Sequence, residues 1–108
     1  MRRGEIWWAG LRVPAGRRPV VLLSRNEAYA VRELVTVAPI TTRVRRIPTE
    51  VPLGPADGLP KACVVNLDTI TIIPRRALTE PIAPLSPEKL TAVERALLFA
   101  LGFGHRSV

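Results

Sequence analysis

Short apolar runs, separated by proline, glycine and polar residues, recur along the first three quarters of the chain. Residues 5–9 form one such run and predict a first strand, and residues 20–23 form a second run of the kind found in buried strands. Residues 34–38 are apolar and β-branched, and they predict a third strand. We expect this strand to end at Pro39, because proline cannot donate a hydrogen bond to a central ladder.

Three more strands are predicted farther along the chain. Residues 49–53 show an alternating pattern, which indicates a half-exposed strand at a sheet edge. A turn-rich loop over residues 54–60 precedes two further apolar runs, at residues 62–66 and 69–73. All the predicted strands are therefore short.

The periodicity changes near the C-terminus. Ser86 is a suitable N-cap, Pro87 suits the first position of a helix, and Gly102 suits its end. One face of this predicted helix carries the apolar residues Leu90, Val93, Leu97 and Leu101. Leu98 and Phe99 lie off that face, so the helix is apolar on more than one side. It is either deeply enclosed or part of a subunit contact.

These elements predict a mainly β (α+β) fold, organised as a single domain over residues 1–108. Several short strands with one terminal helix indicate a small, strongly curved β-barrel or sandwich followed by a C-terminal α-helix. Such a barrel has few interior positions. We therefore expect its functional surface to be built from loops and strand ends.

The composition adds a strong positive charge to this picture. The chain has 16 Lys and Arg against nine Asp and Glu, which gives a net charge of +7. Fourteen of the basic residues are Arg, which binds phosphate through planar, bidentate hydrogen bonds. This excess favours a polyanionic partner, although an Arg-rich composition is also typical of a GC-rich genome.

Several chemistries are excluded by what the chain lacks. Its single cysteine, Cys63, excludes an internal disulfide and is expected to be a small core residue, and its single histidine, His105, argues against a Ser-His-Asp or Cys-His apparatus. No carboxylate pair has metal-ligand spacing and no zinc pattern is present, so we predict a site without metal or cofactor. The longest apolar run, residues 96–101, is too short to span a membrane. With no secretory signal at the N-terminus, we expect a cytoplasmic protein that does not associate with membranes.

Two clusters of residues are suited to phosphate chemistry. Arg17 and Arg18 stand directly before Pro19, which holds Arg18 in an extended conformation at the mouth of a strand. Such an Arg is suited to clamping a phosphate or stabilising a phosphorane transition state, or it is an ordinary solvated residue.

The second cluster follows the third strand. Thr41 and Thr42 precede Arg43 and Arg45, so two hydroxyls lie beside a basic segment. This arrangement suits phosphate binding, but the hydroxyls equally suit local hydrogen bonds that cap the strand. The adjacent residues Trp7 and Trp8 are expected to face opposite sides of a strand, one in the core and the other available to stack on a base or to form a wall or subunit contact.

The order of these motifs resembles the MazF/PemK family of toxin endoribonucleases from bacterial toxin–antitoxin systems. The match is collinear and covers nearly the whole chain. The matching segments are Arg3-Gly4-Glu5-Ile6-Trp7, Arg18-Pro19-Val20-Val21, Val37-Ala38-Pro39-Ile40-Thr41-Thr42, Gly58-Leu59-Pro60-Lys61 with Val64-Val65-Asn66, and Leu85-Ser86. Residues 10–16 form a shorter connection than in many members, where a longer loop helps to hold RNA.

The resemblance implies an SH3-like β-barrel (PemK/CcdB-like) with a C-terminal helix, usually assembled as a homodimer. It implies metal-independent cleavage of single-stranded RNA at short motifs, with Arg18 and Thr41 as the catalytic residues. Attack by the 2′-hydroxyl leaves a 2′,3′-cyclic phosphate and a 5′-hydroxyl. We assign substrate binding to the neighbouring residues Arg17, Thr42, Arg43, Arg45 and Lys61, and leave the general base unassigned.

The same resemblance implies a protein partner, a MazE-like antitoxin whose acidic, poorly ordered tail covers the basic groove. Two other functions are compatible with the predicted fold. One is a non-enzymatic toxin that inhibits gyrase, although the C-terminal residues 102–106 lack the Trp-Gly-Ile type of ending associated with such toxins. The other is a catalytically silent RNA-binding module.

Overall fold

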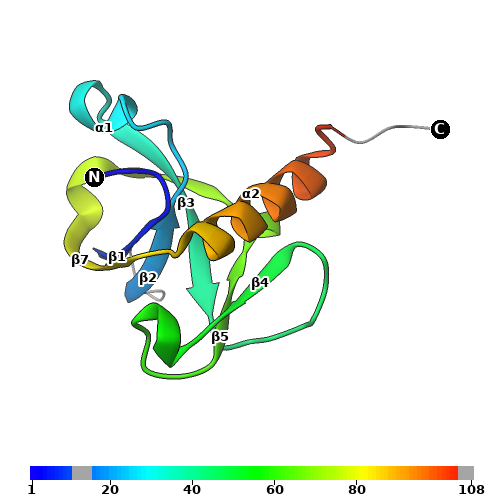
Figure 1. The fold of residues 1–108 in the computed structure, drawn as a ribbon. Coiled ribbons are helices and arrows are strands. Elements are labelled where there is room, and N and C mark those ends of the chain that lie inside the picture. The colour runs from blue at the N-terminus through cyan, green and yellow to red at the C-terminus, as the bar shows by residue number, and fades with distance from the viewer. Residues whose placement is uncertain (11–15, 105–108) are drawn as a thin grey trace.

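The computed structural model describes residues 1–10 and 16–104, and these residues form mainly strands (Figure 1). The strands are β1 (Glu5–Gly10), β2 (Arg17–Leu22), β3 (Leu34–Thr41), β4 (Glu50–Leu53), β5 (Cys63–Asn66), β6 (Thr71–Pro74) and β7 (Leu78–Pro84). The α-helices are α1 (Ala28–Val31) and α2 (Pro87–Leu101). Three short 3₁₀ turns are η1 (Pro55–Asp57), η2 (Leu67–Thr69) and η3 (Arg75–Ala77).

The strands form one antiparallel sheet in the order β4-β5-β3-β2-β1-β7, with β6 paired to β3. One edge of β3 is shared, because its first half pairs with β6 and its last two residues pair with β5. Within the described residues β4 and β7 do not pair, so the sheet stays open. The predicted mainly β class and C-terminal helix are confirmed, and the strands of the described residues form an open sheet where the sequence indicated a small barrel or sandwich.

Pro39 lies inside β3, and the strand continues to Thr41, so the predicted end of this strand is wrong. The carbonyl of Thr36 accepts a hydrogen bond from the backbone that follows β2. Because backbone groups alternate along a strand, the nitrogen of Pro39 faces the opposite edge of β3. Along this edge of β3, the pairing with β6 ends at Val37 and the pairing with β5 begins at Ile40. Pro39 lies between the two, so the sheet loses no ladder hydrogen bond to the proline.

Two elements of the structure were not predicted from the sequence. The strand β7 carries Pro81 and Pro84, which obscure its periodicity, and it lies at the sheet edge beside β1, where proline is tolerated. The helix α1 has only four residues, too few to show a helical period. In addition, β6 begins at Thr71, two residues later than predicted, because the preceding residues form η2.

Two clusters of buried side chains lie on opposite faces of the sheet. Val21 of β2 belongs to the first cluster, whereas its neighbours Val20 and Leu22 belong to the second, as alternation along a strand requires. The first cluster includes Val93 and Ala96 of α2, which crosses the sheet in Figure 1 and packs on β4 and η2. The helix therefore covers one face and leaves the ends of β2 and β3 accessible.

The helix α2 begins and ends where the sequence predicts. The Ser86 hydroxyl accepts a hydrogen bond from the Lys89 backbone N–H at 3.1 Å, and the backbone N–H of Gly102 donates to the last turn. Leu98 and Phe99 are 48% and 59% exposed, so α2 is not deeply enclosed. None of the described helices is both long and apolar enough to cross a bilayer.

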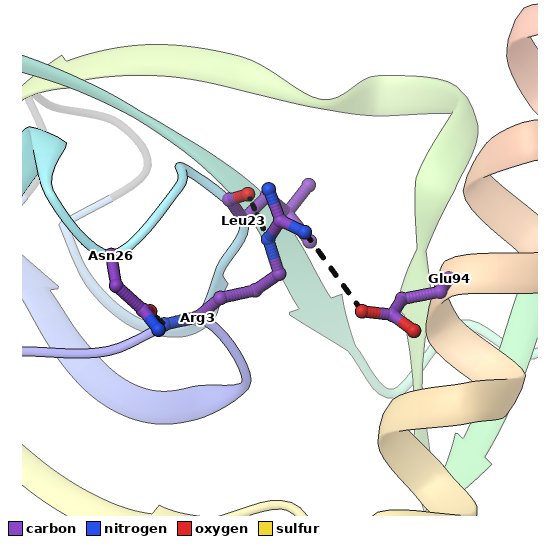
Figure 2. A network of polar contacts seen from close by, with 4 residues as sticks. All are labelled: Arg3, Leu23, Asn26 and Glu94. Atoms are coloured by element: carbon purple, nitrogen blue, oxygen red, sulfur yellow. Dashed lines mark hydrogen bonds and ion pairs between the residues drawn. The ribbon is translucent and has the colours of Figure 1, made fainter.

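Arg3 ties the start of the chain to α2 (Figure 2). Its backbone N–H donates to Oδ1 of Asn26 at 2.7 Å and its Nε donates to the Leu23 carbonyl at 2.9 Å, while Nη1 lies 3.9 Å from Oε2 of Glu94 on α2. Gly4 follows with a φ of +91°, and a Cβ there would lie 3.0 Å from a leucine side chain of α2. The Arg3-Gly4 pair thus fixes β1 closely against the helix.

Candidate active site

A pocket of about 420 Å³ opens where β2 begins and β3 ends. Its walls come from β1, β2, β3 and the loop that leads into β5. The lining residues are Trp8, Arg17, Arg18, Pro19, Ile40, Thr41, Thr42, Leu59, Pro60, Lys61 and Cys63. Both predicted catalytic residues, Arg18 and Thr41, are in this lining, together with three of the residues predicted to bind substrate.

The pairing of β2 with β3 explains why Arg18 and Thr41 meet. The strands are antiparallel, and Val20 pairs with Pro39. Arg18 lies two residues before Val20 and Thr41 lies two residues after Pro39, so both extend from this pair toward the same end of the two strands, where both line the pocket. Residues more than twenty positions apart in the sequence thus share one strand end.

The Thr41 hydroxyl makes a local hydrogen bond and still retains its proton. Its Oγ1 accepts from the backbone N–H of Arg43 at 3.1 Å. A threonine hydroxyl has one donor hydrogen and two acceptor lone pairs, so this contact leaves the O–H able to donate. The capping hydrogen bond and the proposed phosphate contact are therefore compatible.

Arg17 stacks on Trp8 at the rim of the pocket. Its guanidinium carbon lies 4.4 Å from the centroid of the Trp8 ring, and its Nη2 forms an ion pair with the Glu80 carboxylate. Glu80 is in β7, and its register opposite Trp8 brings it to this rim. Sequence reasoning missed Glu80 because β7 itself was not predicted, and no local motif singles it out.

Trp7 packs against the second cluster of buried residues, as expected for one of the two tryptophans, although neither ring is fully buried. Both are half-buried. Trp7 packs against the second cluster and its Nε1 donates to Glu5 at 2.9 Å, whereas Trp8 lines the pocket. The pairing of β1 with β7 shifts on both sides of this tryptophan pair, and the extra residues at the two shifts, Ile82 and Thr79, belong to β7.

Lys61 reaches the pocket from the loop between η1 and β5. The backbone N–H of Gly54 donates to Oδ2 of Asp57 at 2.9 Å, which closes the turn. Gly58 follows with a φ of +92°, and a Cβ there would lie 3.0 Å from the Cβ of Ala83 in β7. A larger residue does not fit without movement of this loop, so the glycine sets the course of the chain toward Lys61.

Cys63 lines the pocket and is buried, as predicted for a core residue. Burial raises the pKa of its thiol, and the negative charge of Asp57 raises it further. The thiol is therefore protonated at neutral pH and is a poor nucleophile.

Arg43 and Arg45 are exposed and do not line the pocket, although the sequence groups them with Thr41. They lie on the segment between β3 and β4, which is anchored by Glu50. The Glu50 carboxylate is 8% exposed, and its Oε1 accepts from the backbone N–H groups of Arg45 at 2.9 Å and Arg46 at 3.0 Å. Residues 49–53 were predicted to form a half-exposed strand at a sheet edge. The strand is at the edge, but the side chain turns inward to satisfy this loop.

The chemistry of the described lining suits an anion. Arg17, Arg18 and Lys61 are positive, and the described lining residues include no carboxylate or histidine. Among residues 1–10 and 16–104, no group of three or more histidine, cysteine, aspartate or glutamate side chains is placed to hold a metal ion. His105 and residues 11–15 of the predicted short connection lie outside the described residues.

Residues 2–101 match the family model described as PemK-like, MazF-like toxin of type II toxin–antitoxin system. A curated relative from Mycobacterium tuberculosis, described as probable endoribonuclease MazF5, is 37% identical over 100 residues. That alignment covers 92% of this chain and 91% of the relative.

Two solved structures have the same fold. The Mycobacterium tuberculosis toxin MazF-mt6 matches with a TM-score of 0.85 at 35% identity, covering 94% of this chain and 99% of that chain. An endoribonuclease in complex with its cognate antitoxin, from a mycobacterial species, also matches with a TM-score of 0.85, at 27% identity, covering 98% of this chain and 99% of that chain.

Proposed function

This chain belongs to the PemK-like, MazF-like family of toxins, and we propose that it cleaves single-stranded RNA in the pocket at the ends of β2 and β3. The observation that carries the proposal is the meeting of Arg18 and Thr41 in one positively charged pocket. The relatives described as endoribonucleases favour this activity over gyrase inhibition and over silent RNA binding.

The chemistry uses a nucleophile that the RNA itself carries. The 2′-oxygen forms a bond to the adjacent phosphorus, the bond from phosphorus to the 5′-oxygen breaks, and the 2′-proton passes to a base that we leave unassigned. The products are a 2′,3′-cyclic phosphate and a 5′-hydroxyl. The protein's part is to hold the chain in line and to neutralise the charge of the phosphorane.

Arg18 and Thr41 are suited to these two tasks. Arg18 offers its guanidinium to the phosphorane oxygens and hydrogen-bonds to the leaving 5′-oxygen, which takes up a proton from Arg18 or from water as its bond to phosphorus breaks. The Thr41 hydroxyl, whose oxygen already accepts from the Arg43 backbone, donates to a non-bridging oxygen. Arg17, Thr42 and Lys61 hold the flanking phosphates, and Arg43 and Arg45 extend the basic surface beyond the pocket.

We further propose two partners. An antitoxin with an acidic tail competes with RNA for the surface around Arg17, Arg18 and Arg43, where opposite charges favour association. A second copy of this chain covers the exposed apolar residues of α2, of which Leu98 and Phe99 are about half exposed. A ternary complex of antitoxin, RNA and toxin with full cleavage would contradict the first proposal, and a monomer in sedimentation at micromolar concentration would contradict the second.

Replacement of Arg18 tests the activity. Arg18→Ala is expected to leave the fold intact and to lower kcat by roughly 10²- to 10³-fold, the cost of losing one donor to a developing negative charge. Arg76→Ala is the matched control, because Arg76 is also exposed but lies in η3, outside the pocket. Equal cleavage rates for the two variants would show that the assignment is wrong.

A further inference from the structure

The Trp8 ring, the Arg17 guanidinium and the Glu80 carboxylate form a compact group at the rim of the pocket. Arg17 lies 4.4 Å over the ring and pairs with Glu80. Trp8 stands between the two partners in the sheet, because β1 pairs with β2 on one side and with β7 on the other. The ring itself is half-buried, whereas the side chains of Arg17 and Glu80 are 54% and 60% exposed.

We propose that this group is a nucleobase subsite, in which a base of the RNA stacks on Trp8 and takes the place of Arg17. The proposal rests on the proposed function, since it adds a base contact to the same pocket. When the base arrives, Arg17 leaves the ring and Glu80 and binds a phosphate of the same strand. Glu80 is the counter-ion that holds Arg17 in place while no RNA is bound.

The magnitudes favour this exchange. An exposed ion pair and an exposed cation–π contact each stabilise only weakly, because water screens both. A base stacked on an aromatic side chain is a stronger contact, and the released Arg17 gains a charge-assisted hydrogen bond to phosphate. The contacts that Arg17 makes in the structure are therefore weaker than those that the RNA offers in return.

The position of Trp8 also suits a base next to the reacting phosphate. Trp8 pairs with Pro19, and the following residue, Ala9, pairs with Arg18. Paired strands lie about 4.7–4.9 Å apart and consecutive residues about 3.3 Å apart. The ring is thus within one nucleotide of a phosphate held by Arg18.

Binding of a non-cleavable RNA tests the subsite apart from catalysis. The probe is a single-stranded 2′-O-methyl RNA of mixed sequence, and its dissociation constant is measured by fluorescence anisotropy. Trp8→Ala is expected to weaken binding roughly 5- to 100-fold, and Trp8→Phe far less, because phenylalanine retains a stacking face. Trp7→Phe, at the tryptophan that packs against the second cluster, is expected to bind as the parent does.

Glu80→Gln gives a readout that a purely structural role would not produce. The amide cannot hold Arg17 by an ion pair, so the variant is expected to bind the RNA several-fold more tightly than the parent. In cleavage, Trp8→Ala is expected to raise KM with little change in kcat. In the Trp7→Phe background Trp8 is the remaining tryptophan, and stacking is expected to quench its fluorescence.

Unchanged affinity in Trp8→Ala and Trp8→Phe, or unquenched Trp8 fluorescence on RNA binding, would overturn the base subsite while leaving RNA cleavage in place. Weaker binding by Glu80→Gln would overturn the exchange of Arg17. If Trp8→Ala does not fold, the affinity of Trp8→Phe and the fluorescence of Trp8 still test whether a base stacks on this ring. A folded parent that neither binds the probe nor cleaves RNA would overturn the proposed function itself.

Discussion

Replacing Thr41 by valine removes the hydroxyl while keeping the shape of a β-branched strand residue. In the folded chain the hydroxyl oxygen accepts one hydrogen bond, from the Arg43 backbone at 3.1 Å in an exposed position. A typical hydrogen bond contributes about 0.5–1.5 kcal/mol, and here water replaces the lost acceptor, so we expect at most about 1 kcal/mol of lost stability. In the transition state the same hydroxyl donates to a phosphorane oxygen, and its loss is expected to cost about 3–4 kcal/mol, or roughly 10²- to 10³-fold in rate.

The two effects separate in a simple pair of assays. Thermal unfolding reports the stability, and single-turnover cleavage with saturating protein reports the chemical step without RNA binding. Thr41→Ser is the matched variant, because it restores the hydroxyl without the methyl group, and it is expected to recover most of the rate. A Thr41→Val variant that melts like the parent and cleaves within about three-fold of its rate would refute the role of the hydroxyl.

Three further predictions concern the residues that support the pocket. Glu50→Ala is expected to lower the free energy of unfolding by about 2 kcal/mol, because two backbone N–H groups lose a buried acceptor, and Glu50→Gln by less, as denaturant titration will measure. Because burial raises the pKa of Cys63, its thiol is expected to react more slowly with iodoacetamide at pH 8 than a free cysteine does, and alkylation as fast as in unfolded protein would contradict this. For the same reason, the contribution of this thiol to the free energy of unfolding is expected to fall as the pH rises above the ordinary thiol pKa of 9.0. Gly58→Ala is expected to displace the loop that carries Lys61, since its Cβ would lie 3.0 Å from that of Ala83, and thus to raise KM; a variant with parental KM and melting temperature would show that the loop yields at no cost.

The sequence pattern predicted those elements whose signals are local. The helix α2 has a capping serine, a first-turn proline and a terminal glycine, and it forms between them. The predicted end of β3 was wrong because the strand accommodates Pro39 in the gap between its partners β6 and β5. This gap is a property of the sheet and not of the local sequence. The strand β7 was missed for a similar reason, since its prolines are acceptable only at an edge.

The residues of the candidate site likewise fall into those with a local sequence signal and those whose place depends on the pairing of distant strands. Arg18 and Thr41 stand out in the sequence as a basic residue before one strand and a hydroxyl after another, and the β2–β3 register brings them together. Arg43 and Arg45 look like part of the same motif, but the chain turns away from the pocket to reach Glu50. Glu80 carries no local signal, because its place beside Trp8 depends on a strand pairing between the two ends of the chain.

The most direct test of the central claim is a cleavage assay in EDTA. Purified protein is mixed with a long single-stranded RNA of mixed sequence, and the ends of the products are mapped. We predict discrete cuts at a short recurring motif, with 5′-hydroxyl and 2′,3′-cyclic phosphate ends and no dependence on metal. An RNA left intact by folded protein, or cut only when a divalent metal is added and with 5′-phosphate ends, would contradict the account.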